Sequence, residues 1–195
     1  ESHQHRLTHP LFVAKCKTVG DTFEMKLFMK HIVSTISVLL LSLSLGWADD
    51  YRKALEAYEK GDFTTMFKEL LPLAERGNAI AQNTIGELYY NGQGVIQDYK
   101  TAAKYFRLAA NAGDATAQTW LGSLYHRGQG VTQDYKTAFK WYLRAAEQGK
   151  GIAQGKLSAM YGSGHGVIED IVYAHMWANI AISVGYEKAR ILKNV

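Results

Sequence analysis

The feature that most constrains the fold is an internal repeat of 36 residues. Three full units align without a gap, at residues 81–116, 117–152 and 153–188. A partial unit precedes them at 49–80, and residues 189–195 restart the pattern as the beginning of a cap. A unit of this length cannot bury its own apolar face, so neighbouring units must cover one another. The sequence therefore predicts a stack of like units.

Each unit has the pattern of two helices. In the first full unit, Ile85, Leu88 and Tyr89 recur at helical spacing near residues 81–91, and a second helix follows near residues 99–111. The tyrosine recurs in every unit, as Tyr89, Tyr125 and Tyr161. A glycine costs about 1 kcal/mol relative to alanine inside a helix. Because Gly86 and Gly122 repeat that cost in register, we expect the second helix to approach closely there.

A glycine-rich link ending in G-x-G-V separates the two helices of each unit. The second glycine of this link recurs in register at Gly94, Gly130 and Gly166. Glycine ends helices because it accepts a positive φ. An aspartate opens each second helix, at Asp98, Asp134 and Asp170. Its carboxylate can accept hydrogen bonds from free backbone N–H groups, so we expect an N-cap there. The predicted fold is all-α, a right-handed α/α superhelix of stacked helix-turn-helix repeats.

The repeat pattern A-Q-x-x-L-G-x-x-Y-x-x-G-x-G-V-x-x-D-Y resembles the Sel-like repeat family, relatives of the tetratricopeptide repeats. The resemblance covers residues 51–195 and implies a scaffold that assembles partner proteins, with no cofactor. In such stacks the first helices line the concave face. By similarity, the outward residues that would contact a protein or peptide partner are Asn83, Glu87, Tyr90, Thr119, Ser123 and His126.

The N-terminal quarter of the chain has a different character. Residues 25–48 combine Lys26 and Lys30 with 14 uncharged residues from Ile32 to Leu45, followed by a small-x-small cleavage site, which is typical of a signal peptide. The sequence thus predicts a periplasmic or secreted protein. A membrane contact would follow only if the segment stayed uncleaved, and a buried core helix is the remaining alternative. Residues 1–24 are interpreted as a non-native or disordered segment upstream of the signal.

Composition and motifs argue against several other functions. Net charge is only +4 and no dense basic stripe occurs, so nucleic acid is not an expected partner. The predicted mature region lacks cysteine, and its histidines have no ligand spacing, so no metal site is expected. No serine is followed by lysine three residues on, which disfavours a β-lactamase-like hydrolase. The chain is predicted not to be an enzyme. A module that binds peptidoglycan or glycan fragments is the main alternative, and the oligomeric state stays open.

Overall fold

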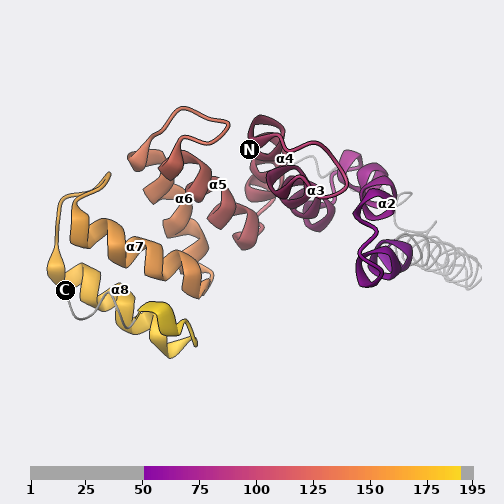
Figure 1. Ribbon diagram of the computed structural model, residues 1–195. Coiled ribbons are helices and arrows are strands. Elements are labelled where there is room, and N and C mark those ends of the chain that lie inside the picture. The colour runs from indigo at the N-terminus through magenta and orange to yellow at the C-terminus, as the bar shows by residue number, and fades with distance from the viewer. Residues whose placement is uncertain (1–50, 190–195) are drawn as a thin grey trace, which may run out of the picture. The chain divides into compact units, whose positions relative to one another are not determined.

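A computed structural model describes residues 51–189 (Figure 1). This part of the chain contains helices and no strand. Residues 51–59 are helical, and seven helices of 13 residues each follow. They are α2 (Phe63–Glu75), α3 (Ala79–Asn91), α4 (Tyr99–Asn111), α5 (Ala115–Arg127), α6 (Tyr135–Glu147), α7 (Gly151–Ser163) and α8 (Ile171–Ser183). The prediction of an all-α repeat architecture is confirmed.

The helices pack as a series of hairpins. α3 packs against α4, α5 against α6, and α7 against α8, and each hairpin also contacts the next through α4–α5 and α6–α7. The core follows the same order. One cluster joins Phe106 of α4 to Leu121 and Leu124 of α5, and the next joins Tyr142 of α6 to Leu157 of α7. Each hairpin therefore supplies apolar surface that its neighbour needs.

The helix starts follow local capping chemistry. The Asp98, Asp134 and Asp170 carboxylates accept backbone N–H bonds at the starts of α4, α6 and α8, as predicted. The first helix of each full unit begins two residues earlier than expected from the repeat alignment. For α3 and α5, Asn78 and Asp114 explain the difference, because their side chains cap these helices by accepting from the amides of Ala81 and Ala117.

The second glycine of each link lies against the preceding repeat. Gly130 has φ +69°, and a Cβ placed on it would lie 2.6 Å from the amide nitrogen of Lys100. Gly94 and Gly166 meet the starts of α2 and α6 in the same way. The link therefore needs glycine for two reasons, a left-handed backbone and a backbone-to-backbone contact between repeats.

Glycines inside the first helices accommodate aromatic rings. A Cβ on Gly86 would lie 2.7 Å from the Phe106 ring, and one on Gly122 would lie 2.8 Å from the Tyr142 ring. The close approach predicted at these glycines is confirmed. In the last repeat the equivalent positions hold Ser158 and Ala178, both buried. A larger residue on one helix is thus matched by a smaller one on the other, which keeps the volume of the contact similar.

Residues 1–50 and 190–195 lie outside the described residues. The predicted signal peptide at 25–48, the upstream segment 1–24 and most of the predicted cap at 189–195 therefore remain predictions. Between residues 51 and 189, the structure has no helix with the length and apolar character needed to cross a membrane.

Candidate functional site

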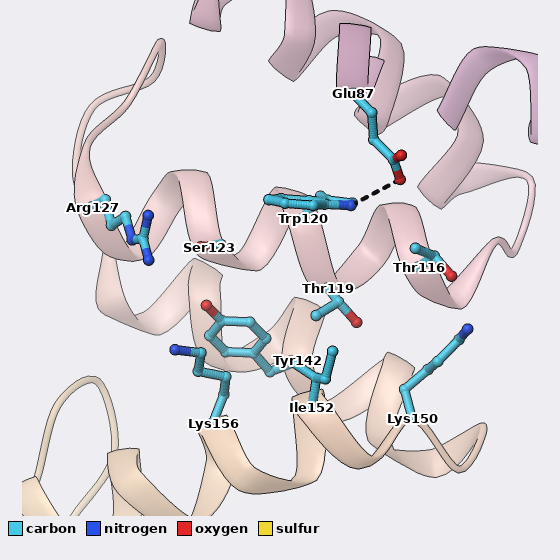
Figure 2. A pocket seen from close by; sticks show the side chains of 10 residues that line it. All are labelled: Glu87, Thr116, Thr119, Trp120, Ser123, Arg127, Tyr142, Lys150, Ile152 and Lys156. Carbon is cyan, nitrogen blue, oxygen red and sulfur yellow. Dashed lines mark hydrogen bonds between the residues drawn. The ribbon is translucent and has the colours of Figure 1, made fainter. Parts of the chain in front are cut away.

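A pocket of about 420 Å³ lies on the face formed by α3, α5 and α7 (Figure 2). α5 supplies Thr119, Trp120 and Ser123 along one wall. α7 supplies Ile152 and Lys156 opposite, and the Tyr142 ring from α6 lies between them. The Tyr142 ring gives the pocket an apolar floor. This ring packs against Gly122, and only 1% of Tyr142 is exposed. We call this pocket and its extension described below the α5–α7 groove.

Three of the predicted partner-binding residues, Glu87, Thr119 and Ser123, line this pocket. Asn83 does not, because it is buried rather than directed outward. Its Nδ2 donates to Glu87 Oε1 at 2.9 Å, and so the prediction that Asn83 is an outward contact residue is wrong. Its role in the structure is to position the Glu87 carboxylate, which also accepts from Trp120 Nε1 at 3.1 Å.

Tyr90 belongs to an aromatic cluster at the edge of the pocket. Its ring lies 4.9 Å from that of Trp120 and 5.2 Å from that of Tyr99, measured between ring centroids. Trp120 in turn stacks on Phe106 at 5.7 Å. Both rings are therefore held by contacts within the fold. Arg127 donates to the Tyr90 hydroxyl at 3.2 Å, which joins the cluster to the end of α5.

His126, the sixth predicted residue, lies in a second cavity of about 240 Å³. This cavity shares Tyr142 and Lys156 with the first and also contains His165. The His126 ring meets the edge of Tyr135, on which the His165 ring stacks at 4.7 Å. Burial, together with the charge of Lys156, lowers the pKa of His126 below its ordinary value of 6.5. The two cavities are adjacent, because Tyr142 and Lys156 line both, and together they are the α5–α7 groove.

The groove carries a set of cations that the repeat pattern did not identify. Arg127, Lys150 and Lys156 line the larger cavity together with a single carboxylate, Glu87. Burial lowers the pKa of Lys156, and the nearby Arg127 lowers it further. Burial also raises the pKa of Tyr142 to about 12, so its hydroxyl stays protonated and its ring remains uncharged at neutral pH.

A sequence signal for one of these cations was present. Lys150 occupies the N-cap position of α7, where the preceding first helices have Asn78 and Asp114. A lysine cannot accept the backbone N–H bonds, and α7 has no side-chain cap. Lys156 aligns with Thr84 and Trp120, so the repeat offers no precedent for it.

The chemistry of the groove favours binding. Ser123 lines the same cavity as Tyr142, whose phenol is no general base at neutral pH. Within residues 51–189 no group of three or more histidine, cysteine, aspartate or glutamate side chains could hold a metal ion. The arrangement offers an apolar floor, aromatic edges and positive charge.

A comparison with models of protein families identifies the repeat. The Sel1 repeat model matches residues 79–114, 115–150 and 151–186, in phase with the helix starts. No curated protein matches the sequence.

Solved structures give similar results. A protective antigen of uropathogenic Escherichia coli with an SLR fold is 35% identical, with TM-score 0.66, over 69% of this chain and 30% of its own. A Sel1 repeat protein from Oxalobacter formigenes is 32% identical, with TM-score 0.66, over 70% of this chain and 56% of its own. The chain thus spans less than a third of the length of the first structure and just over half of the length of the second. Cysteine-rich protein B of Helicobacter pylori shares the fold at 18% identity and TM-score 0.55, with 66% and 96% of the two chains covered.

Proposed function

Because the chain belongs to the Sel1 repeat family, whose members generally serve as protein-interaction scaffolds, we propose that it binds a segment of a partner protein in the α5–α7 groove. The proposed role is non-enzymatic. The groove would hold the segment in an extended form along the seam between the two helices, with side chains entering the two cavities.

The observation that supports this proposal is that the two cavities lie next to each other. They hold about 420 and 240 Å³ and share Tyr142 and Lys156. Pockets that bind small ligands have volumes of about 300–1,000 Å³, so the larger cavity is big enough to bury a side chain. Trp120 and Tyr142 are held by contacts within the fold, so their positions need no reordering when a partner binds.

We further propose that the interaction takes place in the periplasm or outside the cell. The support is the apolar segment after Lys26 and Lys30, with its small-x-small site at residues 46–48. Fractionation of cells that express the full chain would test this. The expected result is a shortened protein in the periplasmic or extracellular fraction, and a full-length cytoplasmic protein would contradict it.

The groove is tested by blocking it. Peptides that bind the protein are selected from a displayed library, and their affinities are measured by fluorescence anisotropy. Thr119→Trp fills the larger cavity without adding charge, so it should weaken binding by at least about tenfold, or 1.4 kcal/mol. Leu108→Trp on α4 is the matched control, since Leu108 is 44% exposed and lines neither cavity of the groove.

The control should bind as the unmodified protein does, and both variants should retain the far-UV circular dichroism spectrum. If all selected peptides bind the Thr119→Trp variant with unchanged affinity, the partner does not occupy the groove and the proposal is wrong.

A further inference from the structure

We infer that the α5–α7 groove selects acidic peptide segments, in which one or two carboxylates next to an apolar side chain pair with Lys156 and Arg127 at one end of the larger cavity or with Lys150 at the other (Figure 2). This inference rests on the proposed function and specifies the chemistry of the partner. The apolar side chain would lie against Trp120 and Ile152, on the walls of the same cavity.

The charges that face the larger cavity are unbalanced. Arg127 ends α5, Lys150 is the N-cap of α7 and Lys156 lies within α7. Glu87 is the one carboxylate among the lining residues. Glu87 Oε1 already accepts from Asn83 Nδ2 at 2.9 Å and from Trp120 Nε1 at 3.1 Å. Its charge is therefore held on the α3 side by neutral donors. The cations on the α7 side remain available to an anion from outside.

Lys156 is the clearest example of a cation that is available to an external anion. Its side chain is half-buried beside Tyr142 and lines both cavities. Within residues 51–189 neither Lys156 nor Lys150 makes an ion pair. A partly buried ammonium without a counter-charge is unfavourable, and here burial and Arg127 both lower the pKa of Lys156. A carboxylate bound in the cavity would remove this penalty, which gives an acidic ligand an advantage over a neutral one.

Lys150 provides a second, independent observation. It stands at the N-cap of α7, where Asn78 and Asp114 cap α3 and α5 with their side chains. Lysine leaves the backbone amides of α7 without that cap and places a positive charge at the positive end of the helix dipole. Lysine at this position thus weakens the helix. Facing the groove, the same charge contributes to the binding of an anion.

A peptide fits these observations better than a nucleic acid does. The positive charges surround an apolar cavity instead of forming a stripe along the surface, and net charge over the chain is only +4. Binding of a phosphate backbone is favoured by a series of cations along a surface. The groove instead has three cations around Trp120 and Ile152, which suits one or two carboxylates beside an apolar side chain.

The experiment compares peptide selections on the unmodified protein and on the variant Lys150→Glu/Lys156→Glu, using one displayed library. Peptides selected on the unmodified protein should be enriched in Asp and Glu next to apolar residues. The charge-reversed variant should lose that enrichment and favour Lys and Arg. For a synthetic acidic peptide from the first selection, Lys156→Glu should weaken binding by about tenfold or more. Lys140→Glu, on the exposed side of α6, is the matched control and should leave the affinity unchanged.

A further variant separates binding from folding. Lys150→Asp restores the side-chain cap found at α3 and α5, so it should raise the melting temperature of the protein while it weakens binding of the acidic peptide. A variant that misfolds would instead lose both melting temperature and peptide affinity.

The outcomes distinguish the two proposals. Selected peptides that Thr119→Trp blocks but that show no acidic enrichment would overturn this inference and leave the groove as the binding site. Peptides that are indifferent to Thr119→Trp, or a selection without any binding peptide, would overturn the proposed function as well. Binding of a single-stranded oligonucleotide with the same dependence on Lys150 and Lys156 would also refute the choice of an acidic peptide.

Discussion

Replacement of Gly130 by alanine tests how neighbouring repeats are held together. Gly130 has φ +69°, and its Cα hydrogens face the backbone of Tyr99 and Lys100 in the preceding repeat. An added Cβ would lie 2.6 Å from the Lys100 nitrogen and closer still to the Tyr99 carbonyl. The two backbones would have to separate by roughly 1 Å to restore ordinary van der Waals contact.

The expected loss of stability has two parts. A left-handed conformation costs a residue with a Cβ about 1–2 kcal/mol. Crowding at a packed contact typically adds about 1–3 kcal/mol. Gly113→Ala isolates the first part, because Gly113 has φ +97° and nothing within 4 Å of an added Cβ. Gly130→Ala should therefore lower the free energy of unfolding by about 2–5 kcal/mol, and Gly113→Ala by about 1–2 kcal/mol.

Urea denaturation followed by far-UV circular dichroism measures both values. Because repeat stacks can lose cooperativity, the whole unfolding curve should be compared and not only its midpoint. If Gly130→Ala and Gly113→Ala lose the same stability, the contact between the link and the preceding repeat contributes little, and our account of the G-x-G-V link is wrong.

Two further predictions concern the groove. The pKa of His126 is lowered in the folded protein, so the unfolded chain binds a proton at a higher pH than the folded chain does. The free energy of unfolding should therefore fall as the pH decreases from 6.5, the ordinary pKa of histidine, through the pKa of His126 in the folded protein. His126→Gln should flatten that part of a pH series of melting curves, and an unchanged slope would contradict the assignment. Gly122→Ser should destabilise the protein by about 1–3 kcal/mol, since its Cβ would lie 2.8 Å from the Tyr142 ring. In the Tyr142→Ala background, which resembles the natural Ser158 and Ala178 pair, the cost should be smaller, and an additive double-mutant cycle would refute the pairing.

The features that the sequence predicted well are those that depend on register alone. Asp98, Asp134 and Asp170 cap helices, and Gly86 and Gly122 allow a close approach of the second helix, because each role is set by a position inside one hairpin and is repeated in the next. Repetition made these roles visible. The helical fold followed for the same reason, since the apolar spacing recurs in phase with the period.

What escaped prediction depends on single residues that interrupt the repeat. Asn83 was expected to face outward, but its amide turns to Glu87 and is buried. The contact at Gly155 was likewise not predicted: the Tyr186 ring covers this glycine, and an added Cβ would lie only 2.6 Å from that ring. These outcomes depend on contacts between side chains that occur once each.

The cations of the groove escaped for a related reason. Arg127 ends α5, the first helix of one repeat, whereas Lys150 is the N-cap of α7 and Lys156 lies within α7, in the next repeat. They come together because α5 and α7 border one cavity, a fact of the packed structure. The α5–α7 groove therefore depends on residues that do not repeat within this chain, although the scaffold that supports it follows the repeat.

The most direct test of the account is site-specific photocrosslinking of a selected acidic peptide. The photoreactive residue p-benzoyl-phenylalanine would replace Ile152, an exposed residue on the groove wall, or Leu108, on the exposed side of α4. We predict a crosslinked product with the probe at Ile152 that an excess of unlabelled peptide abolishes, and none with the probe at Leu108. Equal crosslinking at the two positions, or crosslinking at Leu108 alone, would contradict the claim that the groove is where the partner binds.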